Sequence, residues 1–133
     1  MAIQSAEVKA FDQVAALIAD SGIPYATLTL NPLPISNGIS FAPAGGATET
    51  TFATRDAVCY SDVVLNAKHS NRQTAFDTLS RIHEMLTKLK VFTAGSNYEI
   101  IGINTISSPQ YLSEGDNGQY LFGSSLRINY YRR

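Results

Sequence analysis

His69, His83 and Cys59 are the only histidines and the only cysteine of this 133-residue chain, and these side chain types are the usual ligands of zinc and copper. The histidines lie about four helical turns apart along one predicted helix, whereas the cysteine lies in a predicted strand. A metal site needs three or four converging ligands, and no C-x-x-C or H-x-x-x-H spacing is present. We therefore expect neither a bound metal nor a cofactor.

Other signatures of catalysis are missing as well. There is no G-x-S-x-G motif, and Gly123-Ser124-Ser125 falls inside a predicted strand, where small residues usually relieve packing. Gly45-Gly46 lacks the Lys-Ser or Lys-Thr that follows a phosphate-binding loop. Acidic residues are scattered, although a carboxylate pair formed across strands would be invisible in the sequence. The sequence predicts a protein that is not an enzyme.

Basic and aromatic residues are interleaved in residues 126–133, a mixture that can bind single-stranded nucleic acid. A solvated strand end is the simpler interpretation. The net charge of −1 excludes tight independent binding to DNA, because affinity for phosphates scales with the number neutralised. Four residues are candidates for a face towards DNA or a protein partner: Lys68, Arg72, Arg132 and Arg133.

Composition indicates a single domain over residues 1–133 with one core, since 44% of the residues are hydrophobic. Charged residues make up only 16%, against about 25% in ordinary soluble domains, so the surface is poorly defended against self-association. No apolar stretch approaches the length of about 20 residues that spans a membrane, so we expect no membrane partner.

The elements that position these residues follow from periodicity. The first helix, 5–21, is capped by Ser5 and has an apolar stripe of Val8, Phe11, Ala15 and Ile18. The second begins at Ser70, which forms a capping box with Gln73, and it has an apolar stripe of Ala75, Leu79, Ile82, Leu86 and Leu89. Strands are expected at 25–30, 56–67, 98–106 and 119–131, with the third and fourth joined by a connection over 107–118. Alternation places on one face of the second strand Cys59, Val63, Leu65 and Ala67, and on one face of the fourth Tyr120, Phe122, Leu126, Ile128 and Tyr130. The prediction is an α+β fold, with two helices packed on one face of a mostly antiparallel sheet.

A nearly uncharged arm, 31–55, interrupts this pattern with the sequence N-P-L-P-I-S-N-G-I-S-F-A-P-A-G-G-A-T-E-T-T-F-A-T-R. It holds three of the five prolines. A disordered linker should be charged and poor in bulky apolar side chains, and this segment is neither. We predict an extended hairpin or lasso that contacts another protein surface. Its expected assembly contacts are Pro32, Leu33, Ile35, Ile39, Phe41 and Phe52.

From Leu28 onward the order of these patterns resembles a known family. The strongest parts are P-A-G-G-A at 43–47, the strand and helix from V-V-L-N-A-K-H-S at 63–70 to 86, and S-P-Q-Y-L-S-E-G-D-N-G-Q-Y-L-F at 108–122. They are similar to the small minor capsid proteins of tailed bacteriophages, whose members resemble tail-terminator proteins.

The resemblance implies a structural virion protein with no catalytic residues. It implies a homo-oligomeric ring of six copies that caps the tail tube and forms part of the head–tail joint. The partners would be further copies of the chain, the tail tube protein and a head-completion or connector protein, with DNA only as cargo passing through the ring. The protein would be assembled in the host cytoplasm and would reside in the virion, at the head–tail junction.

Two alternatives stay open. The protein could form a head-completion or adaptor ring on the head side of the joint, which the sequence does not separate from tail termination. A small-molecule-binding α+β domain is the less favoured alternative, and it would require a closed concave pocket lined by converging polar groups.

Overall fold

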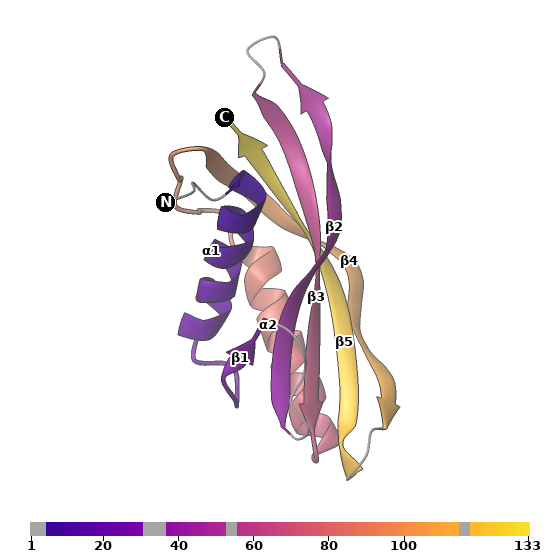
Figure 1. Ribbon diagram of the computed structural model, residues 1–133. Helices are drawn as coiled ribbons and strands as arrows, with labels where there is room; N and C mark the ends of the chain where they lie inside the picture. The colour runs from indigo at the N-terminus through magenta and orange to yellow at the C-terminus, as the bar shows by residue number, and fades with distance from the viewer. Residues whose placement is uncertain (1–4, 31–36, 53–55, 115–117) are drawn as a thin grey trace.

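A computed structural model describes residues 5–30, 37–52, 56–114 and 118–133. The elements in chain order are α1 (Ala6–Asp20), β1 (Leu28–Thr29), β2 (Gly38–Thr51), β3 (Ala57–His69), α2 (Arg72–Lys88), β4 (Tyr98–Glu114) and β5 (Tyr120–Arg132). Both helices pack on one face of the sheet (Figure 1). The predicted α+β class is confirmed.

The sheet has the strand order β1-β2-β3-β5-β4. The short β1 pairs with β2 in parallel, and the other three pairings are antiparallel. The β2–β3 hairpin is long enough to project beyond the ends of both helices (Figure 1). One face of the sheet therefore carries the helices, and we call the other, uncovered face the outer face.

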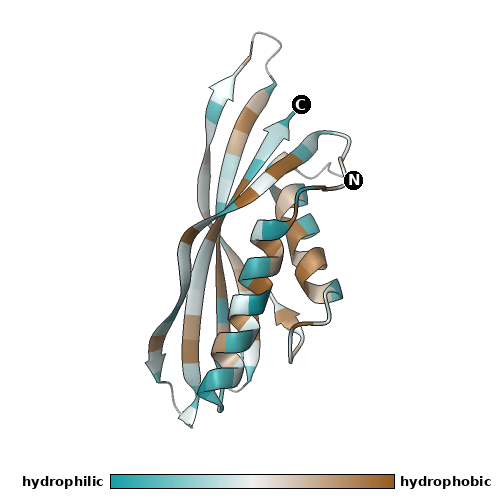
Figure 2. Cartoon of the chain, turned by 180° about the vertical axis from the view of Figure 1, so that it is seen from behind, coloured by the Kyte–Doolittle hydropathy of each residue, from teal (hydrophilic) through white to brown (hydrophobic). Residues whose placement is uncertain are grey.

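The core lies between the helices and the strand residues that point towards them. Along β3, buried and half-buried residues alternate, with Cys59, Val63, Leu65 and Ala67 buried as predicted. The same alternation buries Leu126 and Ile128 on β5, and it appears in Figure 2 as alternating polar and apolar bands. Period-two alternation is the pattern of a sheet with one covered face.

Helix α1 buries Ala15 and Ile18 of the predicted stripe, but the rest of its buried face is shifted from the prediction. Ala6, Ala10, Val14 and Ile18 face the sheet at spacings of four, whereas Val8 is exposed. The prediction followed the bulkiest side chains, but small alanines allow the helix to approach the sheet closely. Phe11 lies at the margin of this stripe, where its ring stacks on that of Phe41 with centroids 4.7 Å apart.

Helix α2 has the predicted buried stripe, but its cap lies one residue later than expected. The Asn71 side chain accepts a hydrogen bond from the Thr74 amide at 3.1 Å, which makes Asn71 the N-cap. The Ser70 amide instead donates to the Asn37 side chain at 3.2 Å, so Ser70 joins the helix start to β2.

The described part of the predicted arm is strand β2, which pairs with β3 along its whole length. In these residues the arm is one strand of an extended hairpin with β3 and not a lasso. Its glycines serve this pairing: Gly45 has a φ of 104° at a register shift, and a Cβ on Gly46 would collide with the carbonyl oxygen of Tyr60. Residues 31–36 and 53–55 lie outside the described residues.

Two strand lengths differ from the prediction. β1 spans only two of the six residues expected at 25–30. β4 continues through Glu114, so most of the predicted connection at 107–118 is strand. Register shifts between Ile100 and Gly102 and at three later points break its period-two pattern. These β-bulges hide the strand from a search for strict alternation.

One buried polar contact ties α2 to β4. The His83 Nε2 atom lies 2.8 Å from the Thr105 hydroxyl, and its Nδ1 atom is buried without a hydrogen-bond partner. Burial lowers the pKa of His83 below its ordinary value of 6.5. The folded state thus favours the neutral imidazole.

Phe41→Ala should destabilise the folded chain by about 3–5 kcal/mol, because it removes a fully buried ring and leaves a cavity beside Phe11. Phe52→Ala, at an exposed position of the same segment, should cost about 1 kcal/mol or less. Urea unfolding of both variants measures the difference. Equal decreases in the free energy of unfolding would contradict the finding that the Phe41 ring is buried and the Phe52 ring is exposed.

The lowered His83 pKa predicts a loss of stability in mild acid. The unfolded chain binds a proton at about pH 6.5 and the folded chain only at lower pH, so stability falls as the pH drops below that value. His83→Gln should reduce the fall in melting temperature between about pH 7 and pH 5, since an amide does not titrate there. If the melting temperature fell equally in the wild type and the variant, the loss of stability in acid would come from groups other than His83.

Candidate assembly surface

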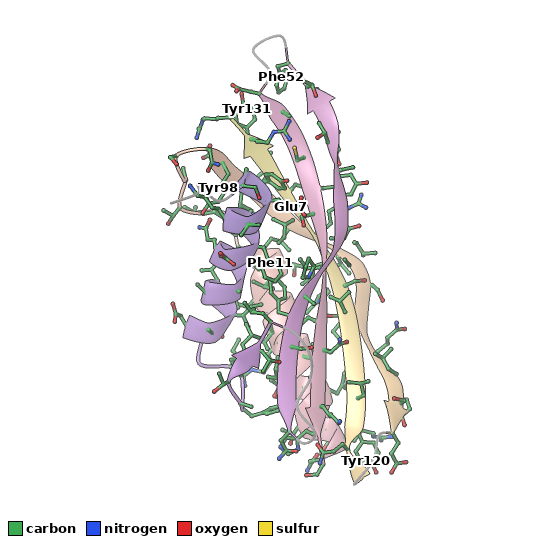
Figure 3. All side chains as sticks on the ribbon, in the orientation of Figure 1. Glu7, Phe11, Phe52, Tyr98, Tyr120 and Tyr131 are labelled. Atoms are coloured by element: carbon green, nitrogen blue, oxygen red, sulfur yellow. The ribbon has the colours of Figure 1, made fainter. Side chains whose placement is uncertain are left out.

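Of the six expected assembly contacts, the three in the described residues do not form one surface. Ile39 and Phe41 are fully buried in the core, so their side chains are not available to a neighbouring subunit and that part of the prediction is wrong. Phe52 is exposed at the projecting end of the hairpin, beside Tyr131 (Figure 3). Pro32, Leu33 and Ile35 lie outside the described residues.

The four candidate basic residues lie at opposite ends of the sheet. Lys68 is opposite Leu121 near one end of β3, and Arg72 begins α2 close to it. Arg132 is opposite Ala57 at the other end. Arg133 follows, 3.6 Å from the Glu99 carboxylate. The structure therefore gives two separate basic clusters rather than one face.

The free edge of β4 has an unusual surface for an exposed strand. β4 is paired only with β5, and between Glu99 and Glu114 it carries no charge. Three residues at its register shifts are large, apolar and about half exposed: Ile101 at 56%, Ile106 at 49% and Leu112 at 47%. Soluble proteins usually protect edge strands with charged side chains, so this edge is built for contact.

The opposite edge of the sheet is also open for most of its length. β1 covers β2 only at Ile39 and Ser40, and beyond that point β2 is hydrogen-bonded to β3 alone. Pro43 is compatible with this position because proline is tolerated on edge strands. Glu49 is the only charge on β2. Both edges therefore offer backbone groups with little charge to repel another strand.

A neutralised ion pair lies on the outer face of the sheet. Arg127 on β5 donates two hydrogen bonds to the Asp62 carboxylate on β3, at 2.8 and 3.2 Å. Its guanidinium also lies 3.9 Å from the centre of the Tyr60 ring. The bond to Asp62 raises the pKa of Arg127 above its usual range. Asn104 and Asn129 lie at neighbouring positions of this face, which also carries the half-buried Val58 and Val64.

An aromatic groove opens between the start of α2 and the β4–β5 hairpin. It has a volume of about 410 Å³ and is lined by Arg72, Gln73, Phe76, Tyr111 and Phe122. The Phe122 ring forms a buried floor, with the Phe76 ring stacked at 5.3 Å and the Tyr111 ring edge-on at 5.5 Å. Phe76 is 46% exposed and Tyr111 is 50% exposed.

Sequence reasoning missed both the bulge residues and this groove. A signal for the groove was present, because Phe76 is a bulky aromatic residue one position away from the buried stripe of α2. A large apolar side chain on the polar side of an amphipathic helix often marks a contact.

The titratable groups of the described residues do not assemble a reactive centre. Within those residues no group of three or more histidine, cysteine, aspartate or glutamate side chains could hold a metal. Burial raises the pKa of Tyr25 to about 12, and its hydroxyl donates to the carbonyl oxygen of Lys68 at 2.8 Å. Tyr25 is thus a neutral structural donor. None of the helices in the described ranges is long and apolar enough to cross a membrane.

Comparison with known proteins gives a match in structure alone. No protein-family model matches the chain, and no curated protein matches its sequence. A chain of the solved "Virion of native gene transfer agent (GTA) particle" matches with a TM-score of 0.56, covering 96% of this chain and 95% of that chain. The two are 10% identical, so the likeness shows a common fold and no more.

The extent of the match is informative about the fold. Because it covers nearly all of both chains, the long outer strands and the projecting hairpin lie within the aligned region. The open edges described above therefore belong to strands of the aligned architecture.

Proposed function

We propose that this protein is a structural component of a phage-like virion that assembles head to tail into a ring and acts as a tail terminator. The observation that carries the proposal is the pair of largely open, nearly uncharged sheet edges, one of which presents Ile101 and Ile106. The fold shared with a chain of a virion particle supports the virion role, and so does the resemblance of the sequence to minor capsid proteins.

Strand directions are compatible with joining one edge to the other. β2, β3, β5 and β4 alternate in direction, so β4 runs opposite to β2. In a ring every copy has the same orientation about the axis, and β4 of one copy would meet β2 of the next as an antiparallel pair. Two different patches on each subunit are what a closed head-to-tail ring requires.

The outer face of the sheet, which the helices leave uncovered, is suited to line the channel of such a ring. The helices occupy space on the other face, so they fit on the outside of a closed circle of sheets (Figure 1). The face left for the channel carries the Asp62–Arg127 pair among asparagines, with little net charge to bind or repel DNA. DNA is then cargo that passes through the ring.

The family resemblance supplies the finer parts of the proposal. They are six copies per ring, a position on the end of the tail tube, and contacts with the tube protein and a head-completion protein. A head-side adaptor ring is the second candidate, because the same edges and channel would serve it equally well.

Ile106→Lys should prevent ring formation. It places a charge in the middle of the apolar β4 edge, and the loss of one buried isoleucine contact alone corresponds to about tenfold or more in affinity. Val8→Lys is the matched control, since Val8 is a similarly exposed apolar residue on α1. Light scattering over a range of concentrations measures the mass of each variant, and circular dichroism checks folding. Wild-type mass in both variants, or a monomeric wild type throughout, would contradict the ring.

Tail length separates the two virion roles. Particles produced without this protein should have overlong tails if it is a terminator, because nothing then stops growth of the tube. Electron microscopy measures the tail lengths directly. Unattached tails of normal length would instead assign the protein to the head side of the joint.

A further inference from the structure

The two sheet edges that join copies in the proposed ring differ in length. β4 has 17 residues, whereas β2 has 14 and is covered by β1 at Ile39 and Ser40. In the described chain, only the part of β2 from Phe41 to Thr51 is open to a neighbouring strand. β4 therefore outreaches this open edge, and its last residues either meet β1 of the next copy or have no strand beside them.

The pairing across the sheet defines which residues lie at the same level, and we call such a set of paired residues a row. Tyr111 on β4 shares a row with Leu28 on β1, through Phe122, Ala67 and Ile39. A ring relates its copies by rotation about one axis, and with the strands along that axis each row is level with the same row of the next copy. Tyr111 then meets the row of the neighbour in which β1 is the outermost strand.

β4 bends at the level where it would have to pass the end of β1. Gln110 shares its row with Thr29, the last residue of β1. Directly beyond that row lie the two register shifts between Thr105 and Ser107 and between Ser107 and Gln110. Bulges bend a strand, and here the bend coincides with a step of one strand spacing, about 5 Å, between β2 and β1 of the neighbour.

Prolines lie close to the same level on both strands of the joint. Pro109 falls within the second of these shifts on β4, and Pro43 on β2 shares its row with Thr105. Neither proline has an amide hydrogen to donate to a neighbouring strand. The interruption of hydrogen bonding therefore falls near the step on both sides of the joint.

The surfaces that the level rows bring together are uncharged and partly apolar. The chain carries no charge over residues 21–48, which include β1, and none over residues 100–113 of β4. Leu30, directly after β1, and Tyr111 are each about half exposed. Charged side chains usually protect an edge strand, and these two edges lack them.

We propose that β4 contacts two strands of the neighbouring copy: residues 98–104 pair with its β2, and Gln110 and Tyr111 lie beside its β1, opposite Thr29 and Leu28. The inference rests on the proposed ring and assigns the register of its joint. Because β1 runs parallel to β2, both contacts with β4 are antiparallel. Tyr111, a wall of the aromatic groove, then packs against Leu30 of the next copy.

Disulfide formation between engineered cysteines tests this register. In a Cys59→Ala background, chains with Thr29→Cys are mixed with chains with Gln110→Cys and oxidised with copper phenanthroline. Opposite residues of antiparallel neighbours have Cα atoms about 5 Å apart, within reach of a disulfide. Within one chain the two positions are four strand spacings apart, about 19 Å. We expect covalent dimers in the mixture and a ladder of oligomers from the double variant.

A second pair of cysteines reports on the joint between β4 and β2. Ala47 and Gly102 share a row, and a Cβ added at Gly102 would meet no atom within 4 Å. Chains with Ala47→Cys and chains with Gly102→Cys should therefore also form dimers. In the control mixture Asn104→Cys, about 13 Å farther along β4, replaces Gln110→Cys and should give no dimer with Thr29→Cys.

Leu30→Lys gives a measurement that needs no cysteine. It places a charge against Tyr111 of the next copy, so the concentration needed for assembly should rise about tenfold or more. Val8→Lys, at a similarly exposed position of α1, should assemble like the wild type. Light scattering measures assembly, and circular dichroism checks that each variant is folded. Unchanged assembly of Leu30→Lys would overturn the packing of Leu30 on Tyr111.

The outcomes separate this inference from the ring itself. Dimers from both cysteine pairs support the proposed register. Rings of normal mass without dimers between Thr29→Cys and Gln110→Cys overturn the contact with β1 and leave the ring standing. Dimers between Ala47→Cys and Gln110→Cys also overturn it, since β4 is then displaced along β2. If light scattering finds no ring, the proposed function and this inference fail together.

Discussion

The pairing of β3 with β5 is the constraint on which the rest of the structure depends. It runs from Ala57 to His69 without a register shift, whereas the β2 and β4 ladders on either side are interrupted by shifts. An unbroken antiparallel ladder fixes which side chains face the helices, because a slip of one residue would move every side chain to the other face. The two central strands therefore define the core, and the outer strands bend around them.

The same constraint explains where apolar surface is left over. Two helices cover one face of a sheet whose long strands extend past them, so the outer face and most of each edge have no cover from the described chain (Figure 1). β-Bulges on an edge strand turn extra residues out of the regular pattern. On β4 those residues are Ile101, Ile106 and Leu112, where charged residues would have protected a monomer.

The sequence predicted those elements whose signals are local and regular. β3 and β5 follow strict alternation, and α2 has a strong apolar stripe, so their faces could be assigned correctly. β4 could not be delimited because its bulges break the alternation. The arm was misinterpreted for a related reason. Ile39 and Phe41 alternate with Ser40 in the sequence, but the surrounding turn residues suggested a hairpin or lasso directed at another protein. Only the pairing with β3 reveals that these side chains belong to the chain's own core.

The candidate site was even less accessible to sequence reasoning, because it combines distant residues. Phe76, Tyr111 and Phe122 come from three elements, and nothing in their spacing predicts that the rings stack. The structure shows that the residues of the core and the exposed apolar residues are different sets. Phe41 supports folding from the covered face of β2, while Ile106 and Phe76 are about half exposed. A protein whose exposed apolar residues contribute little to its own core can fold first and assemble afterwards, which is what the proposed ring requires.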